Sequence, residues 1–161
     1  MKFILVNMKA QSDFESLRKR LKDLRAPYVK AIIMFGSMAR GESKEHSDLD
    51  LLVLHEGCEI EDPVARRRAL YYILREALGA EFEDITLVEM KLADFVSPSE
   101  VTALLLNIYW DAVLVFDKTQ TLNTFLDEIR RRIVESGLKR IRDQRAYSWE
   151  LPEPMKEVKL L

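Results

Sequence analysis

Two short polar segments contain the residue types that phosphate and metal chemistry requires. Gly36 and Ser37 directly follow the apolar run Ala31–Phe35, and after ten further residues Asp48 and Asp50 begin a second apolar run. Glycine lets the backbone approach a bulky anion closely, and a serine hydroxyl can donate a hydrogen bond to a phosphate oxygen. We therefore predict that Gly36 and Ser37 form a turn that binds a triphosphate.

Arg40 is the third candidate for phosphate binding. It lies three residues after Ser37, so a short helix that begins at the turn places both side chains on one side. Its guanidinium can then help to neutralise the anion, and Gly41 suits the end of the turn. Gly36, Ser37 and Arg40 are thus the predicted nucleotide-binding residues.

Asp48 and Asp50 are candidate metal ligands. Because side chains alternate along a strand, their carboxylates share one face, with Cα atoms about 6.6 Å apart. Two unpaired carboxylates about 5 Å apart repel by roughly 3 kcal/mol at an effective dielectric constant near 20. A divalent cation removes this repulsion, and oxygen ligands suit Mg²⁺ or Mn²⁺. The alternative is that the two residues belong to a solvated loop and bind no metal.

A third carboxylate is expected from the acidic start of another strand, Glu81–Val88. Alternation along this run places Ile85 and Leu87 on one face and Asp84 on the other, with Glu83 pointing away from Asp84. Asp84 is therefore the preferred third ligand. Two alternatives remain open, namely Glu83 as the ligand and a solvated strand start with no ligand at all.

The apolar patterning predicts an α/β sandwich that presents these residues at the ends of strands. Helix signals alternate with strands, and the order argues for an α+β fold with one mixed sheet of about four to five strands flanked by helices. The expected helices are bounded by Ser12 and Pro27, by Asp62 and Gly79, by Ser97 and Ile108, and by Leu122 and Ser136. The expected strands are 31–35, 49–54, 84–88 and 111–116.

The spacing of Gly36-Ser37 and Asp48-x-Asp50 resembles that of the nucleotidyltransferase superfamily typified by DNA polymerase beta, specifically its minimal nucleotidyltransferase branch. Ala39-Arg40-Gly41 and Ser47–Leu51 strengthen the resemblance, which covers the segment from about Ala31 to Val88. Members of this family transfer a nucleoside monophosphate from a nucleoside triphosphate to an acceptor hydroxyl. The resemblance therefore implies the same fold and the same transfer here, with AMP from ATP as the first expectation and another triphosphate as the alternative.

The resemblance also implies two Mg²⁺ ions, or Mn²⁺ in their place, held by three carboxylates. Asp48 and Asp50 would hold the ion that binds the triphosphate. The same two residues and Asp84 would hold the ion that lowers the pKa of the acceptor hydroxyl, and Asp84 is also a candidate to take its proton. The turn at Gly36-Ser37 and Arg40 would stabilise the departing pyrophosphate.

With 161 residues, the chain is expected to form one domain, and it contains no repeat or linker. We predict a single nucleotidyltransferase domain over residues 1–136, including the N-terminal helix, and a basic helix with an extended tail over residues 137–161. The helix would contain Lys139, Arg140, Arg142 and Arg145, and the tail would run over Tyr147–Pro154. Met1–Asn7 is a candidate for an added edge strand.

Composition limits the classes of partner that the chain is expected to bind. A formal net charge of −2 disfavours nucleic acid as a partner, and a single cysteine excludes a disulfide framework. Apolar runs are too short for a membrane span or a signal peptide, so we expect a cytoplasmic protein without membrane contact. Arg66–Arg68 and Arg130–Arg132 are expected on solvated helix faces, whereas Lys139–Arg145 is equally suited to docking a partner or a substrate phosphate.

The acceptor is expected to lie partly outside this chain. Family members of this size are commonly paired with a small helical RNase toxin of the HEPN class, which they silence by attaching adenylate to a tyrosine. The resemblance implies such a partner, and the tail favours a homodimer or a hetero-oligomer. The competing hypothesis is a non-catalytic module that uses the same fold to bind a nucleotide or a partner.

Overall fold

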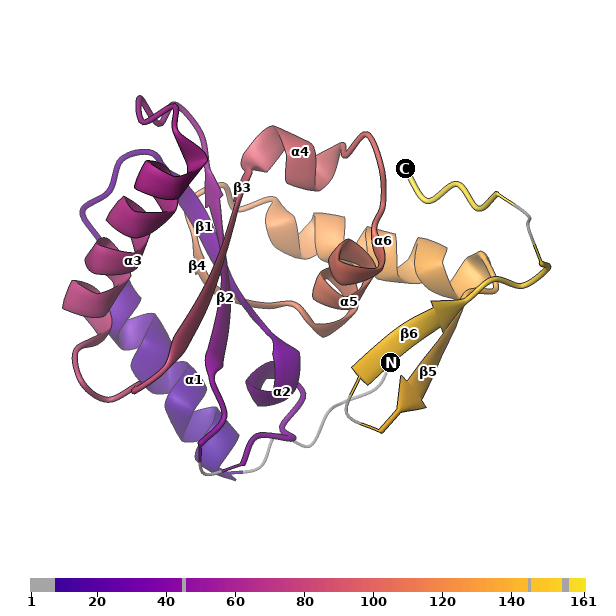
Figure 1. The fold of residues 1–161 in the computed structure, drawn as a ribbon, viewed down its shortest axis with the longest axis horizontal. Coiled ribbons are helices and arrows are strands. Elements are labelled where there is room, and N and C mark those ends of the chain that lie inside the picture. Colours follow the sequence, from indigo (N-terminus) through magenta and orange to yellow (C-terminus); the bar gives the residue numbers. More distant parts are fainter. Residues whose placement is uncertain (1–7, 45, 145, 155–156) are drawn as a thin grey trace.

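Helices and strands alternate along most of the chain (Figure 1). The computed structural model describes residues 8–44, 46–144, 146–154 and 157–161, so the edge strand expected at Met1–Asn7 and the side chain of Arg145 lie outside the described residues. The helices are α1 (Met8–Leu21), α2 (Gly36–Ala39), α3 (Pro63–Leu78), α4 (Leu92–Val96), α5 (Ala103–Asp111) and α6 (Leu122–Glu135). The strands are β1 (Val29–Phe35), β2 (Leu49–His55), β3 (Ile85–Lys91), β4 (Val113–Asp117), β5 (Lys139–Asp143) and β6 (Ala146–Glu150).

The predicted mixed sheet is confirmed. Four strands lie in the order β3-β2-β1-β4, in which β1 is antiparallel to both of its neighbours and β2 is parallel to β3. A parallel pair needs a long crossover, and α3 supplies it between β2 and β3. The antiparallel register places Phe35, the last residue of β1, opposite Asp50. The two polar segments of the sequence therefore meet at one end of the sheet.

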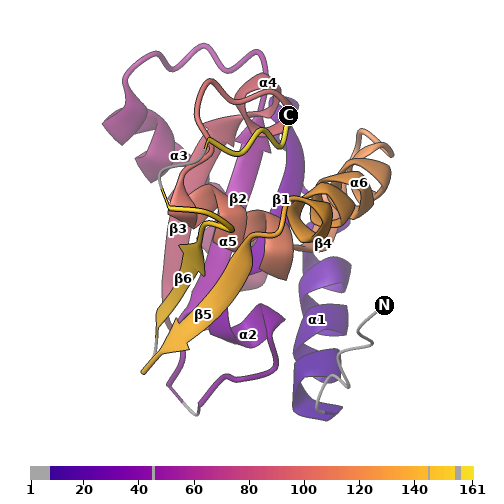
Figure 2. The same ribbon diagram turned by 90° about the vertical axis from the view of Figure 1, so that its right-hand side faces the viewer.

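Helices cover both faces of the sheet, with α1 and α3 on one side and α4, α5 and α6 on the other (Figures 1 and 2). The two central strands are buried on both faces, which explains their continuous apolar sequences. Side chains that face α1 and α3 are Ile32, Met34, Leu49, Leu51 and Val53. Those that face the other layer are Ala31, Ile33, Phe35, Leu52 and Leu54.

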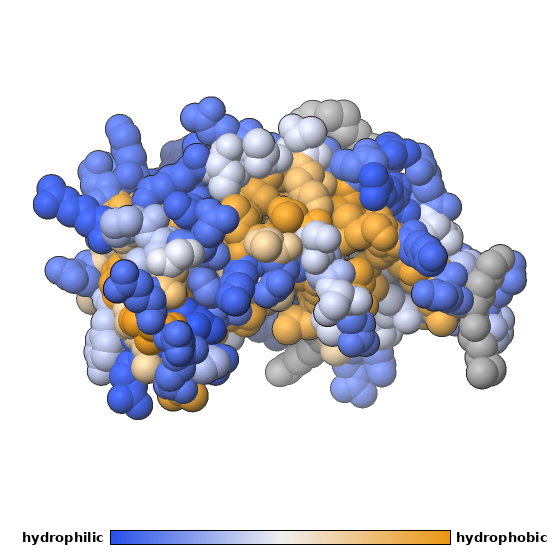
Figure 3. All heavy atoms as spheres, turned by 90° about the horizontal axis from the view of Figure 1, so that it is seen from above, coloured by the Kyte–Doolittle hydropathy of each residue, from blue (hydrophilic) through white to orange (hydrophobic). Residues whose placement is uncertain are grey.

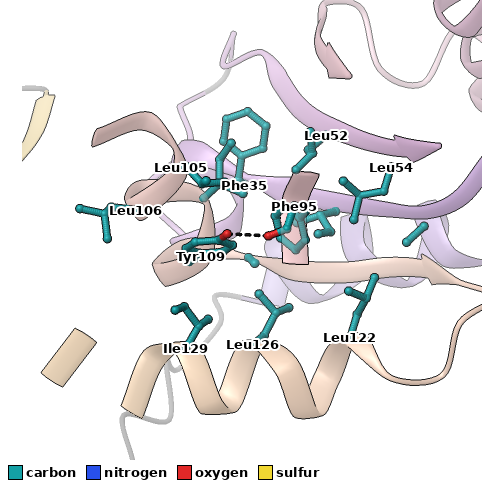
Figure 4. Packing of buried hydrophobic residues seen from close by; sticks show 14 of the residues in the cluster. Phe35, Leu52, Leu54, Phe95, Leu105, Leu106, Tyr109, Leu122, Leu126 and Ile129 are labelled. Atoms are coloured by element: carbon teal, nitrogen blue, oxygen red, sulfur yellow. Dashed lines mark hydrogen bonds between the residues drawn. The ribbon is translucent and has the colours of Figure 1, made fainter. Parts of the chain in front are cut away.

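Aromatic packing holds the second layer together (Figure 4). Tyr109 of α5 is fully buried and donates a hydrogen bond to the carbonyl of Phe95 at 2.6 Å, with ring centroids 5.1 Å apart. Burial raises the pKa of the Tyr109 hydroxyl, which therefore stays protonated. Leu122, Leu126 and Ile129 of α6 line the same cluster. This packing fixes the position of α5, whose last residue is part of the site described below.

Helix starts were predicted with mixed success. Asp62 caps α3 as expected, because its carboxylate accepts a backbone N–H from the first turn at 2.7 Å. The helix start predicted at Ser97–Glu100 is wrong, since Thr102 caps α5 instead and accepts the N–H of Leu105. The reason is α4, which buries Phe95 just after β3 and leaves Ser97 as its C-terminal cap. Ser12, the expected start of the first helix, lies inside α1, which begins at Met8.

The basic helix predicted after Gly137 is also wrong, because the segment forms a β-hairpin of β5 and β6. Alternation along the two strands pairs Arg140 with Trp149 across the hairpin. Trp149 then packs edge-on against Trp110 of α5, with ring centroids 5.7 Å apart, and donates to the side chain of α5 residue Asn107. The contacts of alternate side chains with α5 thus favour a β-hairpin over the helix that the spacing of the basic residues predicted.

The surface is largely hydrophilic, with apolar side chains gathered near the middle of the face seen in Figure 3. The solvated helix face expected for Arg130–Arg132 is wrong for Arg130, which is half-buried and donates to the backbone carbonyls of Tyr109 and Ala112. Arg131 and Arg132 lie on a solvated face of α6 as expected, and both bind Glu128. Their hydrogen bonds lower the pKa of Glu128 to about 2. None of the helices in the described ranges is both long and apolar enough to cross a bilayer.

Candidate active site

The turn after β1 interlocks with the carboxylate of Asp50. Helix α2 begins at Gly36 without an intervening residue, and Gly36 has φ +74°, a conformation that side chains rarely adopt. A Cβ atom at this position would overlap Asp50 Oδ2 and lie 2.9 Å from its Cγ. Glycine is therefore required both by the backbone angle and by the close approach of the carboxylate. This contact brings the predicted phosphate turn and the predicted metal ligand together.

Asp48 and Asp50 lie at the entrance of β2 on the face that also carries Leu52. Asp48 is exposed and Asp50 is half-buried. Burial raises the pKa of Asp50, the charge of Asp48 raises it further, and Arg40 opposes both effects. The pair therefore holds more negative charge than its surroundings balance. Such a donor set fits a divalent cation, which would relieve the repulsion.

The neighbouring strand brings Asp84 and Thr86 to the same edge of the sheet. Asp84 directly precedes β3, and its carbonyl accepts the N–H of Leu49 at 2.9 Å. Thr86 pairs with Asp50 in the parallel register and donates to Asp48 Oδ2 at 3.3 Å. Within the described residues, no three His, Cys, Asp or Glu side chains gather into a group that could hold a metal. The third-ligand role of Asp84 or Glu83 therefore stays a prediction.

A cleft of about 380 Å³ opens beside this strand end. Asp84 and Ser47 line it together with Asp13 of α1 and with residues of the loop before β2 and the segment after α3, among them Lys44 and Glu83. Among the predicted site residues, the cleft reaches Asp84, and neither Asp48 nor Asp50 lines it.

Arg40 is held by carboxylates within the chain. Its Nη1 donates to Asp111 Oδ2 and its Nε donates to Glu42 Oε2, both at 2.9 Å. Burial alone would lower the pKa of Arg40, but the hydrogen bonds with Glu42 and Asp111 raise it. The ring of Tyr147 lies beneath the guanidinium, 4.6 Å from its carbon. The structure thus brings Arg40 to the site, and its contact with phosphate stays a prediction.

Asp111 connects this arginine to the C-terminal hairpin. Its carboxylate is 3% exposed and accepts two hydrogen bonds from Arg140 at 2.7 Å, in addition to the one from Arg40. Arg140 in turn stacks on Tyr147 at 4.0 Å, and the Tyr147 hydroxyl donates to Glu42 at 2.7 Å. Arg140 is therefore bound inside the chain and is not free to dock a partner. The network joins the end of α5, the loop after α2 and the hairpin.

Sequence reasoning missed Asp111, Glu42, Tyr147 and Thr86 as residues of this site. One signal was available for Asp111, a single carboxylate between two strongly apolar runs. A carboxylate in such a place is buried and needs a cationic partner. No pattern identified which arginine that partner is, because Arg40 and Arg140 are both distant in sequence.

A family model described as a nucleotidyltransferase domain matches residues 14–140. The chain belongs to this family. The matched range includes the glycine turn, the three carboxylates, Asp111 and Arg140, whereas Tyr147 of the hairpin lies beyond it.

Relatives are found among proteins of Methanocaldococcus jannaschii whose provisional name is protein adenylyltransferase. MJ1215 is 54% identical over 48 residues, which are 29% of this chain and 56% of the relative. MJ0435 is 42% identical over 73 residues, which are 45% of this chain and 74% of the relative. The chain thus spans about half the length of the first of these relatives. The crystal structure of a toxin-antitoxin with AMP-PNP superposes with a TM-score of 0.45 and 23% identity, over 76% of this chain and 91% of that one.

Replacing Gly36 with Ala is expected to lower the free energy of unfolding of the nucleotidyltransferase domain by about 1–3 kcal/mol. The added Cβ meets both an unfavourable φ and the Asp50 carboxylate, which must move. Urea unfolding followed by circular dichroism measures the loss. Gly41→Ala is the matched control, because Gly41 has φ +71° and nothing within 4 Å of the added Cβ. An equal loss in both variants would contradict the interlock of Gly36 with Asp50.

Proposed function

We propose that this domain transfers AMP from ATP to a hydroxyl group of a protein, in a reaction that depends on Mg²⁺. The observation that supports the proposal most directly is the close approach of the Asp50 carboxylate to the Gly36 turn, beside Asp48. Membership of the nucleotidyltransferase family supports the reaction type, and the names of the relatives support ATP and a protein acceptor.

In the proposed reaction, the acceptor oxygen forms a bond to the α-phosphorus while the bond to the β-phosphate bridging oxygen breaks, and pyrophosphate leaves. Asp48 and Asp50 would hold the metal, with Asp84 as the third ligand and as a candidate for the acceptor proton. Bound Mg²⁺ would supply a lower pKa for the acceptor hydroxyl and charge compensation for the phosphates. Ser37 would donate its hydroxyl to a phosphate oxygen, and the backbone at Gly36 permits close approach of the anion.

Arg40 would contribute positive charge beside the pyrophosphate. In its observed position its charge already opposes the rise in the pKa of Asp50 while it is bound to Asp111 and Glu42. We therefore propose that Arg40 acts mainly through the electrostatic effect of its positive charge on Asp50 and the neighbouring carboxylates. Its side chain then does not have to leave Asp111.

The acceptor we propose is a tyrosine of a small helical partner of the HEPN class, which would make this chain the antitoxin of a toxin-antitoxin pair. The resemblance to minimal nucleotidyltransferases supports the partner class. The cleft next to Asp84 supplies space for an acceptor side chain at the acidic edge.

Transfer of label tests the proposal. The full chain is incubated with extract of the source cell and with ATP labelled in either the α- or the γ-phosphate, with Mg²⁺ or with a chelator. We expect a labelled protein band only from α-labelled ATP and only with Mg²⁺ or Mn²⁺, because AMP and not the γ-phosphate is transferred. A band from γ-labelled ATP that appears only when the chain is added to the extract would contradict nucleotidyl transfer and indicate a kinase.

One observation favours a second candidate, a non-catalytic module that binds a nucleotide or a partner. No ready-made three-ligand metal group is present in the part of the chain that the structure describes. This module would bind ATP in calorimetry without labelling protein or small-molecule acceptors. Labelling that disappears in Asp48→Asn would exclude it.

A further inference from the structure

A basic and apolar groove lies on the opposite side of β3 from the carboxylates, between α3 and the outer edge of the sheet. Helix α3 packs beside β3 (Figure 2), and the groove-lining residues of α3 recur at spacings of three and four residues on one flank of the helix. The groove has a volume of about 340 Å³ and is lined by Val64, Arg67, Arg68, Tyr71, Tyr72 and Leu87.

Large apolar side chains in this groove are open to solvent. Val64 is 62% exposed and Tyr72 is 66% exposed, although both lie on a helix whose other side is packed in the core. Tyr71 meets Tyr72 edge-on, with centroids 6.3 Å apart. Two neighbouring aromatic rings on an open surface are typical of contact surfaces, where tyrosine is enriched.

The groove also carries uncompensated positive charge. Arg67 and Arg68 are exposed and have no ion pair within the described ranges, whereas the preceding Arg66 binds Glu89 at 2.9 Å. On α6, Arg131 is likewise paired, because it binds both Glu128 and Glu135. The expectation that Arg66–Arg68 forms one solvated helix face is therefore too simple. Two of the three cations remain available to an acidic partner.

Strand β3 is an edge strand. It pairs with β2 only, as far as the described residues show, so the groove runs beside a row of backbone groups without a neighbouring strand. An open edge of this kind can accept another extended chain through main-chain hydrogen bonds.

We propose that an acidic, extended segment of a partner protein docks along the outer edge of β3, with its carboxylates on Arg67 and Arg68 and its apolar side chains on Val64 and Tyr72. The positive charges of Arg67 and Arg68 favour an acidic partner. A polypeptide fits better than a nucleic acid, because only a polypeptide can continue the hydrogen-bonding pattern of the strand and only apolar side chains match Val64. The surface lies apart from the cleft at Asp84 and does not depend on nucleotidyl transfer.

Fluorescence anisotropy of the full chain tests the proposal with a labelled ten-residue peptide in which Glu and Val occupy every second position in turn and Thr lies between them, so that both side-chain types face α3. We expect saturable binding that weakens with added salt and becomes at least tenfold weaker in the Arg67→Glu, Arg68→Glu double variant. The matched control is Lys19→Glu with Arg25→Glu, which makes the same change of charge at exposed positions outside the groove. Hydrogen exchange of the amides in β3 is expected to slow when the peptide binds.

Three outcomes would overturn the proposal. The first is the absence of saturable peptide binding to the unaltered chain. The second is an equal loss in the control pair, which would show that only net charge matters. The third is tighter binding of a ten-nucleotide uridine RNA through the same two arginines, which would identify the groove as a nucleic-acid site. Circular dichroism of the double variant verifies that the exposed substitutions leave the fold intact.

Discussion

Asp50→Asn is expected to reduce nucleotidyl transfer by about a thousandfold while the free energy of unfolding rises slightly. A metal ligand stabilises transition-state charge by several kcal/mol, and each 1.36 kcal/mol corresponds to a factor of ten in rate. Stability changes in the opposite direction for a simple reason. The pKa of Asp50 is raised in the folded chain, so its ionised form at neutral pH costs folding free energy that a neutral amide does not. Label transfer and urea unfolding measure the two quantities.

The same comparison includes two further variants. Asp48→Asn is expected to lose transfer to a similar extent, because both carboxylates are proposed to hold the same cation. Asp23→Asn removes a carboxylate from an exposed position away from the sheet edge and should leave transfer and stability unchanged. Full transfer by Asp50→Asn would contradict the metal assignment, and loss of transfer together with loss of structure would indicate a structural role only.

Asp111→Ala is expected to lower the free energy of unfolding by about 3–5 kcal/mol, the largest loss among the variants considered. The substitution removes the carboxylate that receives three hydrogen bonds from Arg40 and Arg140 and leaves two guanidinium groups without it in a poorly solvated place. Arg140 has little compensation elsewhere, since its buried Nε lacks a hydrogen-bond partner within the described chain. Urea unfolding at neutral pH measures the loss.

A double-mutant cycle separates the ion pair from the loss of packing. Arg140→Met combined with Asp111→Ala removes one of the two stranded cations, so the double variant should be more stable than the sum of the single effects implies. Asp111→Asn keeps the volume of the side chain and should lose less than Asp111→Ala. Strictly additive effects would show that Asp111 and Arg140 do not interact in solution.

Local patterns predicted most of the sheet and the acidic edge. The apolar runs before Gly36 and after Asp50 are buried on both faces and became β1 and β2, as expected for central strands. The assignment of Asp62 as a cap also required only neighbouring residues. Failures occurred where a distant contact outweighed the local signal. Thr102 replaced the predicted cap because α4 packs Phe95 into the core, and the basic segment became a hairpin because Trp149 packs on α5.

The sequence by itself determined the two-strand motif, its glycine turn and the family to which the chain belongs, because these depend on residue type and on short spacing along the backbone. The tertiary structure alone decided which groups surround Arg40. Asp111 and Tyr147 reach it from 71 and 107 residues away in the chain, through the packing of α5 and the pairing of the C-terminal hairpin. Periodicity reports which face of an element is buried, but it does not say which buried cation meets which buried carboxylate. That choice depends on how the layers pack, and it makes the C-terminal hairpin part of the site.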